Sequence, residues 1–229
     1  MPGLDGTGRL FGPIIPLLKP LFELVTVTYP DLDSFSEYVD CAQNQLPPEP
    51  GYSIVAESFS GPVALALMAR QHNQIGPSVL SATFARSPLA ELTRMANYIP
   101  DHMFSIGASS EFSQDVYALD GEDLSQTQPL PVNVTDQLDG AVLKHRCQVL
   151  SRIDVSALLP GIEIPILYLH AKHDRIVAES HAEMMQQNLP NVQRVDIDAP
   201  HLLLQTRPKR CAELILKHVQ TGGGASSDR

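Results

Sequence analysis

The sequence predicts an α/β protein with a mostly parallel β-sheet and helices on both faces of that sheet. Short β-prone segments alternate with segments of helical periodicity from residue 22 to residue 219. Residues 164–170, Ile-Pro-Ile-Leu-Tyr-Leu-His, are almost uniformly apolar, as in a strand that is covered on both faces. The chain has 229 residues, of which 43% are hydrophobic, and this is enough for one well-buried core.

The expected helices and strands follow one another along the chain. Residues 9–18 have a helical apolar periodicity, but two prolines make that helix short or irregular. A helix over residues 34–46 begins at Ser34, with Glu37 three residues later as in a capping box. The other expected helices are 62–70, 89–98, 137–150, 179–188 and 207–219. The expected strands are 22–29, 52–56, 78–84, 164–170 and 192–197.

One interval interrupts the alternation of strands and helices. Residues 88–150 separate two sheet strands and contain no obvious strand, which is too long for a simple crossover. We therefore expect a helical cap at 88–150, inserted into an α/β core made of residues 1–87 and 151–220. Residues 221–229 are rich in glycine and serine, as in a flexible tail. The large apolar residues of the expected cap would either shape a pocket or form the core of the cap: Met95, Tyr98, Met103, Phe104, Phe112 and Tyr117.

Charge and composition exclude several classes of partner. The net charge is −10, from 26 acidic and 16 basic residues, with no basic stripe, so neither nucleic acid nor an anionic membrane surface is an expected partner. No apolar run is long enough to span a bilayer, and the first residues do not have the pattern of a signal peptide. The three cysteines are scattered, as in a protein with reduced thiols. We expect a cytoplasmic protein.

Residues 55–61, Val-Ala-Glu-Ser-Phe-Ser-Gly, predict a strand that ends at Ser58 and is followed by a helix. A serine on such a turn has a strained backbone, and its hydroxyl points into a cleft at the edge of the sheet. The turn brings together the residues two before and two after the serine, and Ala56 and Ser60 are both small. Gly61 would let the helix pack closely on the sheet. A serine at a helix start is also a common N-cap, and this segment alone leaves that alternative open.

Two further residues have positions that suit serine hydrolysis, which needs a base for the serine and an acid that orients the base. Asp174 follows the expected strand 164–170, and His201 follows the expected strand 192–197. The carboxyl ends of parallel strands lie at one edge of the sheet, where the turn of Ser58 also opens. We therefore predict Ser58 as nucleophile, Asp174 as acid and His201 as base.

Alternatives exist for both partners of the serine. An aspartate after a strand is often only a turn former. His173 could be offered as the base, but a residue adjacent to Asp174 in sequence usually points away from its carboxylate. His170, His173, Asp174 and His181 could also be considered as a metal site, but their spacing matches no zinc motif. The sequence therefore predicts neither a metal nor a cofactor.

The opening segment Pro-Gly-Leu-Asp-Gly-Thr-Gly-Arg, residues 2–9, has a composition that favours the binding of an anion. Glycines allow backbone N–H groups to approach a bound anion closely, and the following helix adds its positive end. In a hydrolase this loop would supply one donor of an oxyanion hole, the N–H of Leu4, and the N–H of Phe59 would supply the other. A phosphate-binding loop is the rival interpretation, but the Gly-Lys-Ser/Thr ending and a preceding strand are absent from the sequence.

Together these segments resemble the α/β-hydrolase superfamily, in particular bacterial carboxylesterase-like members and the plastid phytyl-ester-synthase group. The resemblance extends over nearly the whole chain and is carried by Pro2-Gly3-Leu4-Asp5-Gly6-Thr7-Gly8, Glu57-Ser58-Phe59-Ser60-Gly61, His173-Asp174-Arg175-Ile176-Val177 and Pro200-His201. It implies the same triad and the same oxyanion hole. The sequence departs from the family in two ways: family members have a strand before the Pro-Gly loop, where this sequence begins, and they usually have glycine at the positions of Ala56 and Ser60.

The function predicted from these residues is a serine carboxylesterase that hydrolyses small to medium acyl esters through an acyl-enzyme on Ser58. A thioesterase or an acyltransferase uses the same triad, so the sequence leaves these alternatives open. A protein of the same fold that binds a ligand without catalysis is a further alternative. The expected partner is a small-molecule ester.

Overall fold

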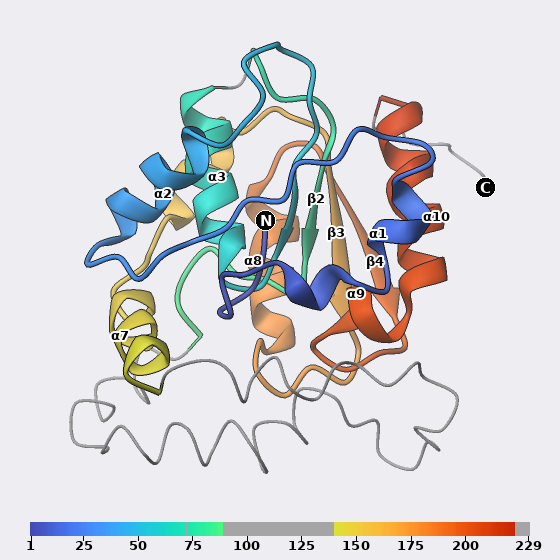
Figure 1. The fold of residues 1–229 in the computed structure, drawn as a ribbon. Coiled ribbons are helices and arrows are strands. Elements are labelled where there is room, and N and C mark those ends of the chain that lie inside the picture. Colours follow the sequence, from blue (N-terminus) through green and yellow to red (C-terminus); the bar gives the residue numbers. More distant parts are fainter. Residues whose placement is uncertain (72, 89–139, 223–229) are drawn as a thin grey trace.

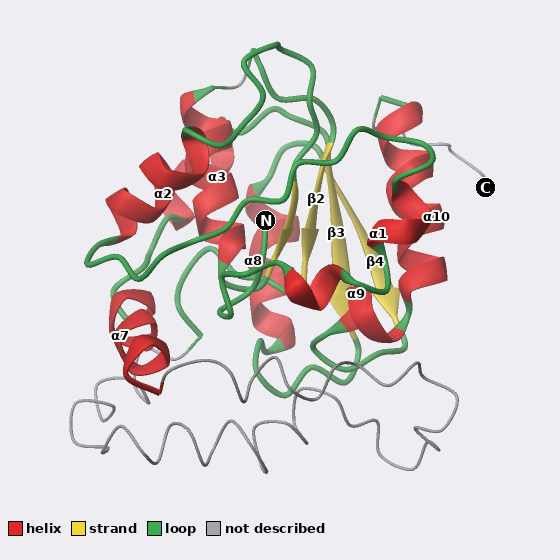
Figure 2. Cartoon of the chain, in the orientation of Figure 1, coloured by secondary structure: helices red, strands yellow, loops and turns green. Residues whose placement is uncertain are grey.

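The computed structural model describes residues 1–71, 73–88 and 140–222. Its strands form one parallel sheet in the order β1-β2-β3-β4. The strands are β1 (Val55–Glu57), β2 (Ser78–Ser81), β3 (Ile166–Ala171) and β4 (Val192–Ile197). Figure 2 shows helices on both faces of this sheet, which confirms the predicted fold class.

The helices of the described residues account for most of the expected ones. They are η1 (Arg9–Phe11), α1 (Ile15–Leu18), α2 (Phe35–Gln43), α3 (Ser60–Arg70), α7 (Gly140–Leu150), η3 (Ser156–Gly161), α8 (Glu179–Asn188), α9 (Leu203–Thr206) and α10 (Pro208–Gln220). The predicted irregular helix at 9–18 is two short pieces, η1 and α1. The short helices η3 and α9 were not predicted. The expected helix 89–98, the six apolar cap residues and most of the expected cap lie outside the described residues.

Local chemistry explains where α2 begins. The side chain of Ser34 accepts a hydrogen bond from the backbone N–H of Glu37, and the Glu37 carboxylate accepts one from the backbone N–H of Ser34. This reciprocal capping box satisfies two of the N–H groups that a helix start leaves without partners. The capping box predicted at Ser34 and Glu37 is therefore confirmed.

The core lies in two layers, one on each face of the sheet. Ala56, Leu80 and Tyr168 face the cluster formed with α2, α3, α7 and α8. Val79 and Leu167 face the opposite cluster, formed with α1, α9 and α10. Figure 1 shows the two groups of helices on opposite sides of the strands. Every residue of β3 is buried, as its almost uniformly apolar sequence predicted.

The prediction of a strand over residues 22–29 is wrong. This segment is extended but has no ladder of hydrogen bonds with a neighbouring strand of the described chain. The backbone N–H and C=O of Thr28 instead bond to the side-chain amide of Gln45, at 3.0 and 2.9 Å. Leu24 and Val25 are 38% and 53% exposed. The β-propensity of the segment is not sufficient, because a strand requires a paired neighbour.

None of the helices that the structure describes has the length and apolar character to cross a bilayer.

Candidate active site

Ser58 lies on a sharp turn between β1 and α3. Its backbone φ is +48°, in the left-handed region that a residue with a side chain rarely adopts. The N–H of Ser58 donates to the carbonyl of Ser81 on β2 at 3.0 Å, and its own carbonyl accepts from the hydroxyl of Thr83. The strained turn is thus held by the neighbouring strand and the residues that follow it.

The small residues two positions before and after Ser58 lie in the packed interior. Ala56 and Ser60 are completely buried. The hydroxyl of Ser60 donates to the carbonyl of Pro2 and accepts from the hydroxyl of Tyr29, 3.0 Å away. The hydroxyl of Ser60, which a glycine at this position would lack, therefore connects the turn to the loop of residues 2–8.

Ser58, His201 and Asp174 form one continuous chain of hydrogen bonds. His201 Nε2 lies 2.9 Å from Ser58 Oγ, and His201 Nδ1 lies 2.7 Å from Asp174 Oδ2. The side chains of His201 and Asp174 are 5% and 2% exposed. A carboxylate only accepts hydrogen bonds, so Nδ1 carries the proton and Nε2 is left to accept from the serine hydroxyl.

Asp174 is both a turn former and the partner of the histidine. Its Oδ1 accepts from the backbone N–H groups of Ile176 and Val177, at 2.9 and 2.8 Å. These two bonds fix the carboxylate, and Oδ2 remains directed at His201. The two interpretations of this aspartate are therefore compatible.

The loop of residues 2–8 lies directly beside Ser58. The N–H of Gly6 donates to the carbonyl of Gly3 at 3.1 Å, which closes a turn that contains Leu4. A methyl group added to Gly3 would lie 3.8 Å from Ser58 Cβ, so the loop approaches the serine closely. Phe59, the other predicted oxyanion donor, is the N-cap residue of α3, and its ring packs edge-on against Tyr38. The residue before Leu4 thus lies close to Ser58, and Phe59 follows Ser58 directly in the chain.

The protein resembles known proteins in its structure. No protein-family model matches the sequence, and no curated protein matches it significantly. The enol-lactonase of Burkholderia xenovorans LB400 superposes with a TM-score of 0.77 at 17% identity, over 95% of this chain and 88% of that one. The α/β hydrolase enzyme MGS-M2, from a Medee basin deep-sea metagenome library, gives 0.78 at 15% identity, over 99% and 90%. A thermophilic esterase from Thermogutta terrifontis gives 0.74 at 19% identity, over 95% and 87%. The protein has the α/β-hydrolase fold.

In this α/β-hydrolase fold, the rival histidine is directed away from the serine. His173 Nε2 lies 2.6 Å from Asp198 Oδ1, and the side chain of His173 is 49% exposed. His181 instead packs against the ring of Phe84, with the ring centroids 6.2 Å apart. Within the part of the chain that the structure describes, no group of three or more potential ligands is arranged to hold a metal ion.

Glu57, the residue before the serine, was not predicted from the sequence as part of the site. Its side chain is completely buried, and Oε2 accepts from Gln205 Nε2 at 3.0 Å. Gln205 belongs to α9, so this bond ties the end of β1 to the segment that carries His201. Burial raises the pKa of Glu57 to about 7, although the amide of Gln205 and the His201 imidazole partly oppose this shift. The sequence does indicate this role, because Glu57 is a charged residue at the end of an otherwise apolar strand.

Arg146 was missed as well. It lies on α7, and its guanidinium group donates to the carbonyls of Leu4 and Asp5, both at 2.8 Å. The sequence does contain a cue, since Arg146 shares the buried face of α7 with Leu143 and Leu150. A cation in an apolar stripe indicates a specific buried partner.

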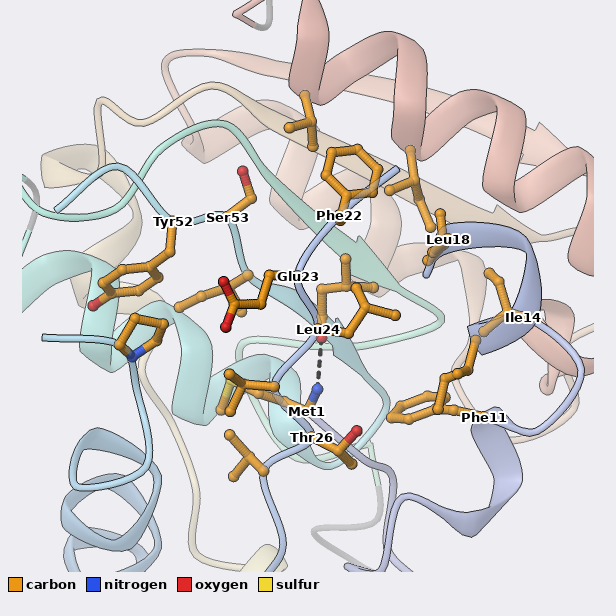
Figure 3. Close-up of a pocket in the computed structure, with 18 of the residues that line it drawn as sticks. Met1, Phe11, Ile14, Leu18, Phe22, Glu23, Leu24, Thr26, Tyr52 and Ser53 are labelled. Carbon is orange, nitrogen blue, oxygen red and sulfur yellow. Dashed lines mark hydrogen bonds between the residues drawn. The ribbon is translucent and has the colours of Figure 1, made fainter. Parts of the chain in front are cut away.

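A hollow of about 310 Å³ lies beside residues 51–55, at the start of β1 (Figure 3). The amino group of Met1 borders it and donates to the carbonyl of Val55 at 2.8 Å. Most of the side chains around it are apolar, among them Phe11, Ile14, Leu18, Phe22 and Leu24. Neither Ser58 nor the other two members of the hydrogen-bonded chain line this hollow, so it is separate from the candidate active site.

Proposed function

We propose that this protein is a serine hydrolase that cleaves carboxylic esters with small to medium acyl groups. The observation that carries the proposal is the hydrogen-bonded chain from Ser58 Oγ through His201 to Asp174. A nucleophile within reach of a base, and a base oriented by a buried acid, is the arrangement that activates a serine. Among the neighbours in structure, an esterase and an enol-lactonase support an ester substrate, because a lactone is a cyclic ester.

The reaction would begin with attack of Ser58 Oγ on the ester carbonyl carbon. A bond forms between Oγ and that carbon, His201 Nε2 takes the serine proton, and the carbonyl oxygen becomes negative. The N–H groups of Leu4 and Phe59 would donate to this oxyanion. Asp174 remains ionised and stabilises the imidazolium that forms on His201.

The tetrahedral intermediate then collapses. The bond between the carbon and the alkoxy oxygen breaks, and the alcohol leaves with the proton from His201, so that an acyl group remains on Ser58. Water attacks the acyl-enzyme after losing a proton to His201. The second collapse releases the carboxylic acid and returns the proton to Ser58 Oγ.

A fluorophosphonate probe tests the nucleophile directly. We expect the probe to label the wild type, to leave Ser58→Ala unlabelled and to label Ser36→Ala, a control on the exposed side of α2. His201→Ala should lower the turnover of p-nitrophenyl esters by at least about 10³-fold, because the base is lost. If the wild type is not labelled, the proposal is wrong and the result favours the alternative of a protein that binds a ligand without catalysis.

A substrate panel tests the reaction class. We expect p-nitrophenyl esters from acetate to octanoate to be hydrolysed faster than the matching acyl thioesters. Transfer of the acyl group to an added alcohol should be slower than its release to water. Faster cleavage of the thioesters, or predominant transfer to the alcohol, would replace the esterase with a thioesterase or an acyltransferase.

A further inference from the structure

The guanidinium group of Arg146 is buried against the loop that contains Leu4. The residue is 3% exposed, and Nη1 donates to the carbonyls of Leu4 and Asp5 at 2.8 Å each. Nη2 donates to the carbonyls of Tyr29 and Pro30, at 3.0 and 3.3 Å. The rigid planar fork of an arginine can serve several carbonyl oxygens at once, which the flexible ammonium group of a lysine cannot do in the same geometry.

These bonds act on the part of the loop that would bind the oxyanion. The carbonyl of Gly3 is held by the N–H of Gly6, and Arg146 holds the next two carbonyls along the chain. With three successive carbonyls fixed, the peptide planes around Leu4 have little freedom to rotate. Its N–H belongs to the same peptide plane as the carbonyl of Gly3, so the direction of this N–H is fixed too.

The loop is also shaped to receive the arginine. Gly6 has a φ of +68°, and a methyl group at this position would lie 2.5 Å from Arg146 Nη1. A glycine is therefore required both by the backbone conformation and by the approach of the guanidinium group.

We propose that Arg146 is a positioning residue of the oxyanion hole. It keeps the N–H of Leu4 directed at the point where the substrate's carbonyl oxygen becomes negative. This inference rests on the proposed function, since it assigns a role within the same reaction. A donor that is already oriented stabilises the developing charge without reorganisation during the reaction.

The packing of α7 supports a role beyond the folding of the helix. Val149 and Leu150 of α7 belong to the main hydrophobic cluster, and Leu143 is buried on the same side. These apolar contacts remain when Arg146 is replaced. We therefore expect variants at Arg146 to keep the fold and to lose the orientation of the loop.

The test compares Arg146→Gln, Arg146→Lys and Gly6→Ala with the control Arg152→Gln, which changes an exposed arginine just beyond α7. A p-nitrophenyl ester reports kcat and KM. A trifluoromethyl ketone reports the oxyanion hole, because its adduct with a serine carries a negative oxygen at that place. We expect kcat to fall about 10²-fold in the first three variants, as when one oxyanion donor is lost. The inhibition constant of the ketone should rise in proportion, while KM changes less than about threefold; a ground-state defect would instead raise KM.

The outcomes separate this inference from the proposed function. If the wild type shows neither labelling at Ser58 nor ester turnover, the proposed function itself fails. If the wild type is active and Arg146→Gln binds the ketone and turns over like Arg152→Gln, the positioning role is wrong. If both Arg146 variants lose their circular dichroism spectrum, Arg146 is a folding residue and the inference is overturned as well.

Discussion

Gly61, in the first turn of α3, lies against Thr83 with no space for a side chain. A methyl group at Gly61 would lie 1.8 Å from Thr83 Oγ1 and 2.6 Å from both Cβ and Cγ2 of Thr83. Rotation of the threonine side chain cannot remove these contacts, because Oγ1 or Cγ2 always remains in one of the two positions near the methyl group and Cβ does not move. In Gly61→Ala, the start of α3 and Thr83 must therefore separate by about 0.8 Å to reach an ordinary contact distance of 3.4 Å.

The expected cost follows from two effects. Overpacking of a well-packed core costs about 1–3 kcal/mol. The movement also disturbs the hydrogen bond from the Thr83 hydroxyl to the carbonyl of Ser58, which contributes about 1 kcal/mol. We expect a loss of about 3 kcal/mol in the free energy of unfolding and a fall of about 6–12 °C in Tm. Displacement of Ser58 by a similar distance should lower kcat/KM by about 10²-fold.

Urea unfolding and the rate of fluorophosphonate labelling measure the two effects on Gly61→Ala. Gly161→Ala is the matched control, because a methyl group at Gly161 meets no atom within 4 Å. Thr83→Gly removes the obstructing side chain, so the double variant should be less destabilised than the sum of the two single variants. The packing argument is refuted if Gly61→Ala stays within about 0.5 kcal/mol of the wild type and is labelled at the same rate.

Two further substitutions probe the carboxyl groups of the site. In Asp174→Asn, the amide oxygen can keep the two hydrogen bonds from the backbone N–H groups of Ile176 and Val177. The NH₂ group then faces Nδ1 of His201, so the imidazole proton moves to Nε2, the nitrogen that faces Ser58. We expect kcat/KM to fall about 10⁴-fold, as in serine proteases, with an unchanged circular dichroism spectrum; a loss below tenfold contradicts this assignment. Glu57→Gln tests the raised pKa: the wild type should lose stability as pH rises from about 4.5 to about 7, because burial disfavours the carboxylate. Glutamine cannot ionise, so the variant should gain about 3 kcal/mol relative to the wild type between pH 4.5 and pH 8 in urea unfolding, and a difference that does not change with pH argues against the shift.

Local sequence patterns determined the order and type of most elements. The apolar run of β3, the capping box at Ser34 and the small residues around Ser58 each depend on neighbours a few positions away. Such patterns can be read from the sequence, because periodicity and capping are properties of a short segment. They also placed Ser58, Asp174 and His201 just after the ends of three different strands.

Tertiary structure decided the rest. Segment 22–29 pairs with no strand of the described residues, since pairing depends on what lies beside a segment. The bond of Glu57 with Gln205 joins residues 148 positions apart, and the bond of Arg146 with Leu4 joins residues 142 apart. A buried charge signals that it needs a partner, but only the packed chain determines which distant group lies within hydrogen-bonding distance.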